Sequence, residues 1–341
     1  MSVPISIIDT GLVTSVGLTS EAACAAMRAG LSNPTETGFR DSTGEEIVAH
    51  QVPLRQPWRG VGRLAKMAAA AAAESLATVP QGEWGCIPLL LCVAEPERPG
   101  RLADLDEQLF ATICGELNTH FHWRSEVIAR GKVSTNFAFL RARGLLSDEE
   151  IPFVLIVAAD SLVTWPTLGM LERQRRLLMP GNSDGFLVGE GAGALLIGRP
   201  GPTTQLLCTG LGFAMESAHI HSGEPLRGDG LTSAIKEALA DASCEIHDLD
   251  YRITDLSGEQ YYFKESALAL LRTLRVRKEE FDIWHPAASI GECGAAVGPV
   301  VFALAGAASR KGYAPGGASV LCHFANDAGE RAAAVLQFRS R

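Results

Sequence analysis

Three continuous apolar segments, at residues 87–93, 153–159 and 192–198, constrain the fold more than any other feature of the chain. None of them alternates polar with apolar residues, as a strand with one solvated face would. A short uninterrupted apolar run indicates a strand that is covered on both faces. Helix-forming stretches at 63–77 and 136–146 precede the first and the second of these segments. Buried strands that alternate with helices predict α/β layers.

The same pattern starts again after a proline- and glycine-rich joint at residues 199–202. Two similar halves are therefore expected, at 1–200 and 201–341. At the start of the chain we expect a strand at 3–9 and a helix that begins after Thr19 as N-cap. Further elements are expected as strands at 126–129, 206–213, 251–256, 319–324 and 332–338, and as helices at 232–242, 267–274 and 294–309.

Composition excludes several classes of protein. The net charge is −9, from 30 basic and 39 acidic residues, with no basic cluster, so nucleic acid is not an expected partner. The eight cysteines are dispersed without zinc-site spacing, which indicates a reducing compartment, and we expect a cytoplasmic protein. No signal-peptide pattern opens the chain, and no uncharged apolar run reaches about 18 residues, so no membrane association is expected.

Four segments of the chain resemble parts of one known protein family. Residues 183–197, SDGFLVGEGAGALLI, resemble the glycine-rich segment that closes the first half of β-ketoacyl synthases. Residues 8–21 resemble the amino-terminal strand and loop of that family, and residues 239–251 and 289–296 resemble the regions of its two catalytic histidines. The resemblance implies a thiolase-like fold, with two pseudo-duplicated α/β halves in an α-β-α-β-α arrangement.

The glycines of the first segment, Gly189, Gly191 and Gly193, are not a dinucleotide-binding fingerprint. That fingerprint needs a helix after the glycines, whereas the apolar run that follows here is typical of a strand. Close packing of neighbouring chains, which glycine permits, is the better interpretation. The sequence predicts no cofactor.

The chain departs from the family at each position that carries chemistry. The resemblance places a nucleophilic cysteine near Lys132 or Val133, where none occurs. The adjacent Ser134 is a candidate nucleophile, but it lacks a neighbouring histidine base, and a helix N-cap is the alternative role. The two histidine positions hold Asp255 and Glu292.

Acidic residues in these positions oppose condensation. A carboxylate about 4 Å from a developing carbanion raises the barrier by about 4 kcal/mol at an effective dielectric near 20, which slows the reaction about a thousandfold.

Asp255 and Glu292 are alternatively a new acid/base pair or a cation site. The segment that replaces the family's phenylalanine/glycine gate contains Phe324 and Asp327, a third acid near the remnant pocket. Cys293 is a poor shifted nucleophile, because Glu292 beside it raises its thiol pKa.

Two other charged or metal-binding patterns are weak. The pairs His120/His122 and His219/His221 each lack a nearby third ligand, so no metal site is expected. The charged segment 172–176 is predicted to be a solvated helix face.

These observations predict a catalytically inactive ketosynthase-like protein that works as a binding, adaptor-like protein. The resemblance suggests as partner a second copy of the chain, an active ketosynthase, or a secreted effector as in type VI secretion, with an acyl carrier protein as a further option. It also predicts a dimer that forms by pairing of the 153–159 strand across a two-fold axis. The alternative is an enzyme, an acyltransferase or hydrolase of acyl-thioesters that uses Ser134 or a carboxylate.

Overall fold

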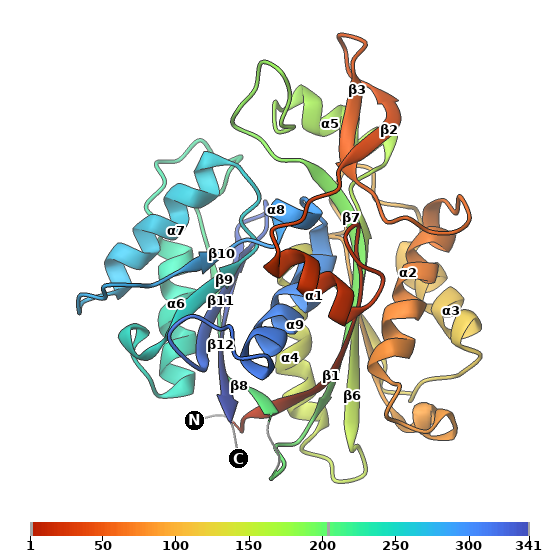
Figure 1. Ribbon diagram of the computed structural model, residues 1–341, viewed down its shortest axis with the longest axis vertical. Coiled ribbons are helices and arrows are strands. Elements are labelled where there is room, and N and C mark those ends of the chain that lie inside the picture. The colour runs from red at the N-terminus through yellow and green to blue at the C-terminus, as the bar shows by residue number, and fades with distance from the viewer. Residues whose placement is uncertain (1–2, 203–204, 340–341) are drawn as a thin grey trace.

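The computed structural model describes residues 3–202 and 205–339, and these residues form five layers (Figure 1). Two helices lie between two halves of a twisted sheet, and a further pair of helices covers each outer face. The α-β-α-β-α order expected from the sequence is therefore confirmed. The central helices are α4 (Ser134–Leu145) and α9 (Val297–Arg310), and the outer pairs are α2 (Gly60–Ser75) with α3 (Leu105–Leu117), and α6 (Asp229–Ala242) with α7 (Gln260–Thr273).

The two halves of the sheet repeat one strand order. In each half the first strand pairs antiparallel with the last, and the remaining strands follow in the same sequence and directions. A short pairing between β1 and β8 joins the two halves, ten strands together, into one continuous sheet. The first half runs β1 (Ile5–Val13), β7 (Val188–Gly198), β6 (Phe153–Ser161), β4 (Leu89–Val93), β5 (Glu126–Ala129). The second runs β8 (Gln205–Met215), β12 (Glu330–Arg339), β11 (Ser319–Ala325), β9 (Tyr251–Thr254), β10 (Ile283–Trp284).

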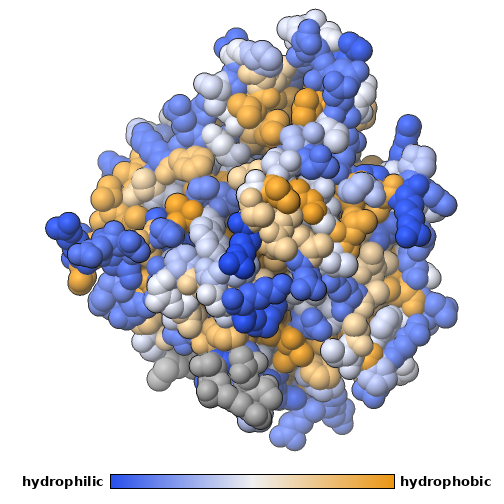
Figure 2. Space-filling model, viewed as in Figure 1, coloured by the Kyte–Doolittle hydropathy of each residue, from blue (hydrophilic) through white to orange (hydrophobic). Residues whose placement is uncertain are grey.

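Most of the shorter elements were not expected from the sequence. A hairpin of β2 and β3 projects at the upper end of the molecule beside α5, and Figure 2 shows hydrophobic side chains gathered there. The shorter elements are β2 (Thr35–Arg40), β3 (Glu46–His50), α1 (Ser20–Arg28), α5 (Trp165–Arg173), α8 (Ala287–Ile290), and the 3-10 turns η1 (Gln81–Cys86), η2 (Gly131–Val133), η3 (Ile246–Asp248) and η4 (Gly294–Ala296). Of these, α1 is the helix expected after Thr19, whose side chain accepts a hydrogen bond from the Ala22 amide.

The apolar segments are buried as their sequence predicts. Every residue of β4 and β7 is buried, because helices cover both faces of this part of the sheet. Residues 297–308 of α9 are buried all round, as expected of a helix between two sheets. A Cβ on Gly193 of β7 would lie 2.6 Å from the Pro299 Cβ of α9, so close packing explains this glycine.

The expected dimer strand is not at an edge. Residues 153–159 lie in β6, which pairs with β7 on one side and with β4 on the other, so this strand has no free side for a second chain. The apolar character of β6 reflects its central position in the sheet. Among the described residues, β5 pairs only with β4 and forms the edge of this half.

Two sequence-based expectations concern the environment of the chain. All eight cysteines are free. Within residues 3–202 and 205–339, no helix has the length and apolar character needed to cross a membrane.

Candidate functional site

The repeated topology brings loops from both halves together at the amino-terminal ends of the central helices. In each half, a loop at the carboxyl end of a parallel strand faces the amino-terminal end of a central helix, which is where α/β sheets place their ligands. The turn η2 precedes α4, and the turn η4 precedes α9. Each turn begins with a glycine in the left-handed region, Gly131 at φ +55° and Gly294 at φ +57°. A side chain on Gly294 would collide with the Asp160 carboxylate, so these turns are fixed tightly.

Lys132, Asp255 and Glu292 meet at this junction. Lys132 lies in η2, Asp255 directly follows β9, and Glu292 lies between α8 and η4. The Lys132 Nζ is 3.4 Å from Asp255 Oδ2 and 3.3 Å from Glu292 Oε2. All three side chains are buried. The positions that the resemblance assigns to the family's cysteine and histidines therefore converge, and they hold an ammonium between two carboxylates.

The surrounding groups fix this cluster in place. The Ala325 amide donates to Asp255 Oδ2 at 2.9 Å, and the Gly294 amide donates to Glu292 Oε1 at 3.0 Å. The Lys132 ammonium also lies 4.8 Å from the centre of the Tyr262 ring, within range of a cation–π contact. One interpretation of the sequence was that Asp255 and Glu292 form a cation site. In the structure, the Lys132 ammonium lies between these two carboxylates.

The charges set the protonation of the cluster. Burial alone would lower the pKa of Lys132, but Glu292 and Asp255 raise that pKa well above its usual value. Burial raises the pKa of Glu292, against the opposing effect of Lys132. Lys132 therefore remains an ammonium, without the lone pair that a nucleophile or base needs. Burial and Glu292 raise the pKa of the Cys293 thiol well above its usual value, so this thiol is a poor nucleophile.

A second ion-pair cluster adjoins the first. Arg176 donates from Nε and Nη2 to Glu259, with both distances 2.7 Å, and also binds Asp327. The Tyr262 hydroxyl donates to Asp327 Oδ1 at 2.5 Å. Although burial alone would raise the pKa of Asp327, Arg176 holds it well below its usual value. Asp327 lines the pocket described below. The solvated helix face expected at 172–176 is wrong for Arg176, which is 6% exposed.

The remaining candidate residues lie outside the cluster. The Ser134 hydroxyl accepts a hydrogen bond from the Arg130 amide at 2.9 Å and donates to the Ile128 carbonyl at 3.0 Å. Its oxygen is therefore occupied by the backbone, and its side chain is fully buried. Val133 is also fully buried, and Phe324 packs against Phe302 in the core. These contacts are those of structural residues.

A pocket of about 360 Å³ opens onto the cluster. Lys132 and Glu292 form its inner end, and Arg176 and Asp327 line its wall. His219 and His221 line it as well. Each of these four charged side chains already has an ionic partner. The pocket therefore contains ion pairs at the positions where the resemblance implies a free thiolate and two imidazoles.

Two features of the site were missed by reasoning from the sequence. Lys132 was placed beside the lost cysteine but not paired with the acids, although a basic residue that aligns with two acidic replacements is a signal of charge compensation. Arg176 was assigned to solvent, because its neighbours in the sequence are charged. Its partner Glu259 lies 83 residues away, and its partner Asp327 lies 151 residues away, so no local pattern reveals either pair.

Comparison with known proteins identifies the fold. No protein-family model matches the chain, and no curated protein sequence matches it. The solved ishigamide ketosynthase/chain length factor superposes with a TM-score of 0.79 at 18% identity, over 100% of both chains. AntDE:AntF, a type II PKS acyl-carrier protein in complex with its ketosynthase, gives a TM-score of 0.82 at 14% identity, over 99% of this chain and 100% of that one.

Two further structures agree. The ketosynthase ApeO in complex with its chain length factor ApeC, from Xenorhabdus doucetiae, gives a TM-score of 0.75 at 13% identity, over 98% of each chain. A β-ketoacyl synthase from Burkholderia phymatum STM815 gives a TM-score of 0.77 at 14% identity, over 99% of this chain and 100% of that one. The chain therefore has the thiolase-like fold of the β-ketoacyl synthases, as its sequence segments predicted.

Proposed function

We propose that the chain is a non-condensing, ketosynthase-like subunit that acts by pairing with an active ketosynthase. The observation that carries the proposal is the Lys132 cluster. Condensation in this fold, as the resemblance implies, uses a thiolate and two imidazoles, and this chain has a protonated amine between two carboxylates at the matching positions. An ammonium cannot attack a thioester, and the two carboxylates repel a developing carbanion.

The enzymatic alternative has less support. Ser134 would need a free hydroxyl and an adjacent base, but its oxygen is engaged by the Arg130 amide and the Ile128 carbonyl. Delivery of a type VI secretion effector stays a prediction from the resemblance alone. Pairing with a ketosynthase has additional support, since two of the similar structures are described as a ketosynthase together with its chain length factor.

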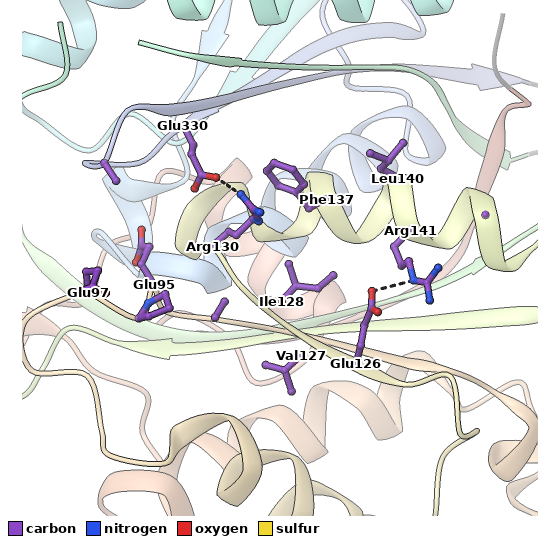
Figure 3. Close-up of a pocket in the computed structure, with 14 residues that line it drawn as sticks. Glu95, Glu97, Glu126, Val127, Ile128, Arg130, Phe137, Leu140, Arg141 and Glu330 are labelled. Carbon is purple, nitrogen blue, oxygen red and sulfur yellow. Dashed lines mark hydrogen bonds and ion pairs between the residues drawn. The ribbon is translucent and has the colours of Figure 1, made fainter. Parts of the chain in front are cut away.

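The free edge at β5 is the surface that we assign to this partner. A groove of about 710 Å³ lies along β5 and α4. Figure 3 shows Ile128 on the α4 side of β5, and the ion pairs Arg130–Glu330 and Arg141–Glu126 at opposite ends of the groove. An edge strand presents unpaired backbone groups that a strand of a second chain can complete.

Apolar side chains flank the same edge. Leu140 of α4 is 48% exposed in the groove, and Trp123 before β5 is 80% exposed. Exposed aromatic and aliphatic residues beside an open strand are typical of an interface core. A ketosynthase of the same fold would present its own edge strand to β5 around a pseudo-two-fold axis.

Coexpression with each ketosynthase of the source genome, followed by native mass spectrometry, tests this pairing. We expect a one-to-one heterodimer with one ketosynthase. Leu140→Arg should abolish it, whereas the matched variant Leu271→Arg, on the exposed face of α7, should leave it intact. A stable homodimer that excludes every ketosynthase, or a heterodimer insensitive to Leu140→Arg, would contradict the proposal.

A further inference from the structure

A second large pocket lies in the first half and shares Arg98 with the pocket at the Lys132 cluster. It has a volume of about 660 Å³, within the range of small-molecule sites. The β2–β3 hairpin and the amino-terminal ends of α2, α3 and α5 surround it, and Figure 1 shows the hairpin and α5 at the upper end of the molecule. None of the groups that form the Lys132 cluster lines this pocket.

Aromatic side chains form part of its wall. Trp58 and Trp165 are 40% and 57% exposed, and both line the pocket with Phe39. The rings of Phe39 and Trp165 are 6.0 Å apart, which makes one continuous aromatic surface. Exposed indole rings are surfaces on which planar rings stack.

Positive charge is concentrated in the same pocket. Its lining includes Arg59, Arg63, Arg98 and Arg101, although the chain carries a net charge of −9. A guanidinium binds phosphate and carboxylate groups through paired hydrogen bonds, so a cluster of arginines favours an anionic ligand.

The acidic residues of the pocket neutralise part of this charge. Asp160 receives both terminal nitrogens of Arg98, together with the amides of Ser161 and Ala295. Glu190 is bound by Arg63, and also accepts from the Val52 amide and the Ser161 hydroxyl. Both carboxylates are buried and pair with Arg63 and Arg98, and Arg101 pairs with Asp106. Among the described residues, Arg59 is the arginine of this lining whose side chain makes no hydrogen bond or ion pair, so Arg59 is the cation left to a ligand.

The start of α2 adds a further site for negative charge. Its N-cap, Arg59, makes no side-chain hydrogen bond to the helix, and no acidic residue lies in its first turn. By contrast, the first turn of α3 contains Asp106 and Glu107, and Thr164 caps α5. The uncapped amides of a sixteen-residue helix favour an anion at this end, where Arg59 and Gly60 line the pocket.

We propose that this pocket binds a phosphorylated ligand that carries a planar ring, of the nucleoside phosphate class. The phosphates lie against Arg59 and the amino-terminal end of α2, and the ring stacks on the aromatic wall that contains Trp165. The proposal is independent of the pairing with a ketosynthase, because the two sites use different residues.

Titration of the full chain with ADP, followed by tryptophan fluorescence and calorimetry, tests the assignment. We expect saturable binding with a dissociation constant below about 1 mM, and binding of adenosine or pyrophosphate at least about tenfold weaker. Arg59→Gln and Trp165→Ala should each weaken ADP binding about tenfold or more, and Trp123→Phe, outside the pocket, should have no effect on affinity.

Three results would overturn it. The first is no saturable binding of ADP by calorimetry. The second is ADP binding that is unchanged in both pocket variants, with the variants shown to be folded by circular dichroism. The third is pyrophosphate binding as tight as that of ADP, which would remove the role of the aromatic wall.

Discussion

Replacement of Lys132 by methionine removes the cation between Asp255 and Glu292 while retaining a side chain of similar length. The Lys132 Nζ lies 3.4 Å from Asp255 Oδ2 and 3.3 Å from Glu292 Oε2. At an effective dielectric of about 20, each attraction amounts to about 5 kcal/mol. Release of the ammonium to water offsets much of this, and loss of one partner from a buried ion pair is expected to lower the free energy of unfolding by about 3–5 kcal/mol.

The pH dependence of this loss is a sharper test than its size. Burial already raises the pKa of Glu292, and Lys132 opposes that rise, so removal of Lys132 raises the pKa of Glu292 in the folded variant further above its value in the unfolded chain. A group with a raised folded pKa loses stability as the pH rises through that value. The destabilisation by Lys132→Met should therefore be larger at pH 8 than at pH 5.5.

Urea unfolding followed by circular dichroism measures both effects. The matched control is Lys311→Met, at a lysine that is 48% exposed and pairs with an exposed Glu21, where a change below about 1 kcal/mol is expected. The triple variant Lys132→Met, Asp255→Asn, Glu292→Gln should recover most of the stability, because amide oxygens can still accept from Ala325 and Gly294. If Lys132→Met is as mild as Lys311→Met at pH 8, the description of a buried ion-pair cluster is wrong.

Three further predictions concern the packing and charges around the site. Arg331→Met should lower the free energy of unfolding by about 3–5 kcal/mol, because Arg331 and its partner Glu265 are fully buried. The control Arg40→Met, at an exposed arginine, should change it by less than about 1 kcal/mol, and urea unfolding measures both variants. Burial lowers the pKa of His323 from 6.5 to about 3. The free energy of unfolding that this residue contributes is therefore complete above pH 6.5, and it falls by at most about 1.4 kcal/mol per pH unit as the pH is lowered toward 3. Urea unfolding of His323→Gln should show a shallower dependence on acid pH. Gly193→Ala should lower the melting temperature, because the added Cβ would lie 2.6 Å from Pro299. Gly115→Ala should raise the melting temperature, because this glycine lies in a helix with open space around it. Equal shifts for the two variants would contradict the packing of β7 on α9.

Much of the fold could be predicted from the sequence, because its strands are apolar runs and its central helix α9 is apolar all round. These patterns follow directly from burial between layers. The β2–β3 hairpin, α3 and α5 lie at the surface, where weaker apolar patterning left them unrecognised. The choice of β6 as the dimer strand was wrong for a different reason. A strand as apolar as β6 belongs in the middle of a sheet, whereas the edge strand β5 is short and only partly buried.

The candidate site was predicted in part. Resemblance placed Lys132, Asp255 and Glu292 at equivalent positions, and the structure brings these residues together. The ion pairs themselves could not be read from the sequence, since Lys132 and Glu292 are 160 residues apart. Charge compensation between distant residues depends on the three-dimensional arrangement, which local patterns do not contain.

Intact mass spectrometry after incubation with an acyl-thioester tests the central claim that this chain does not carry acyl groups. An active ketosynthase under the same conditions serves as the positive control. The account predicts no increase in the mass of the chain at times when the control is fully acylated. A covalent acyl adduct that maps to Ser134, Lys132 or Cys293 would contradict it.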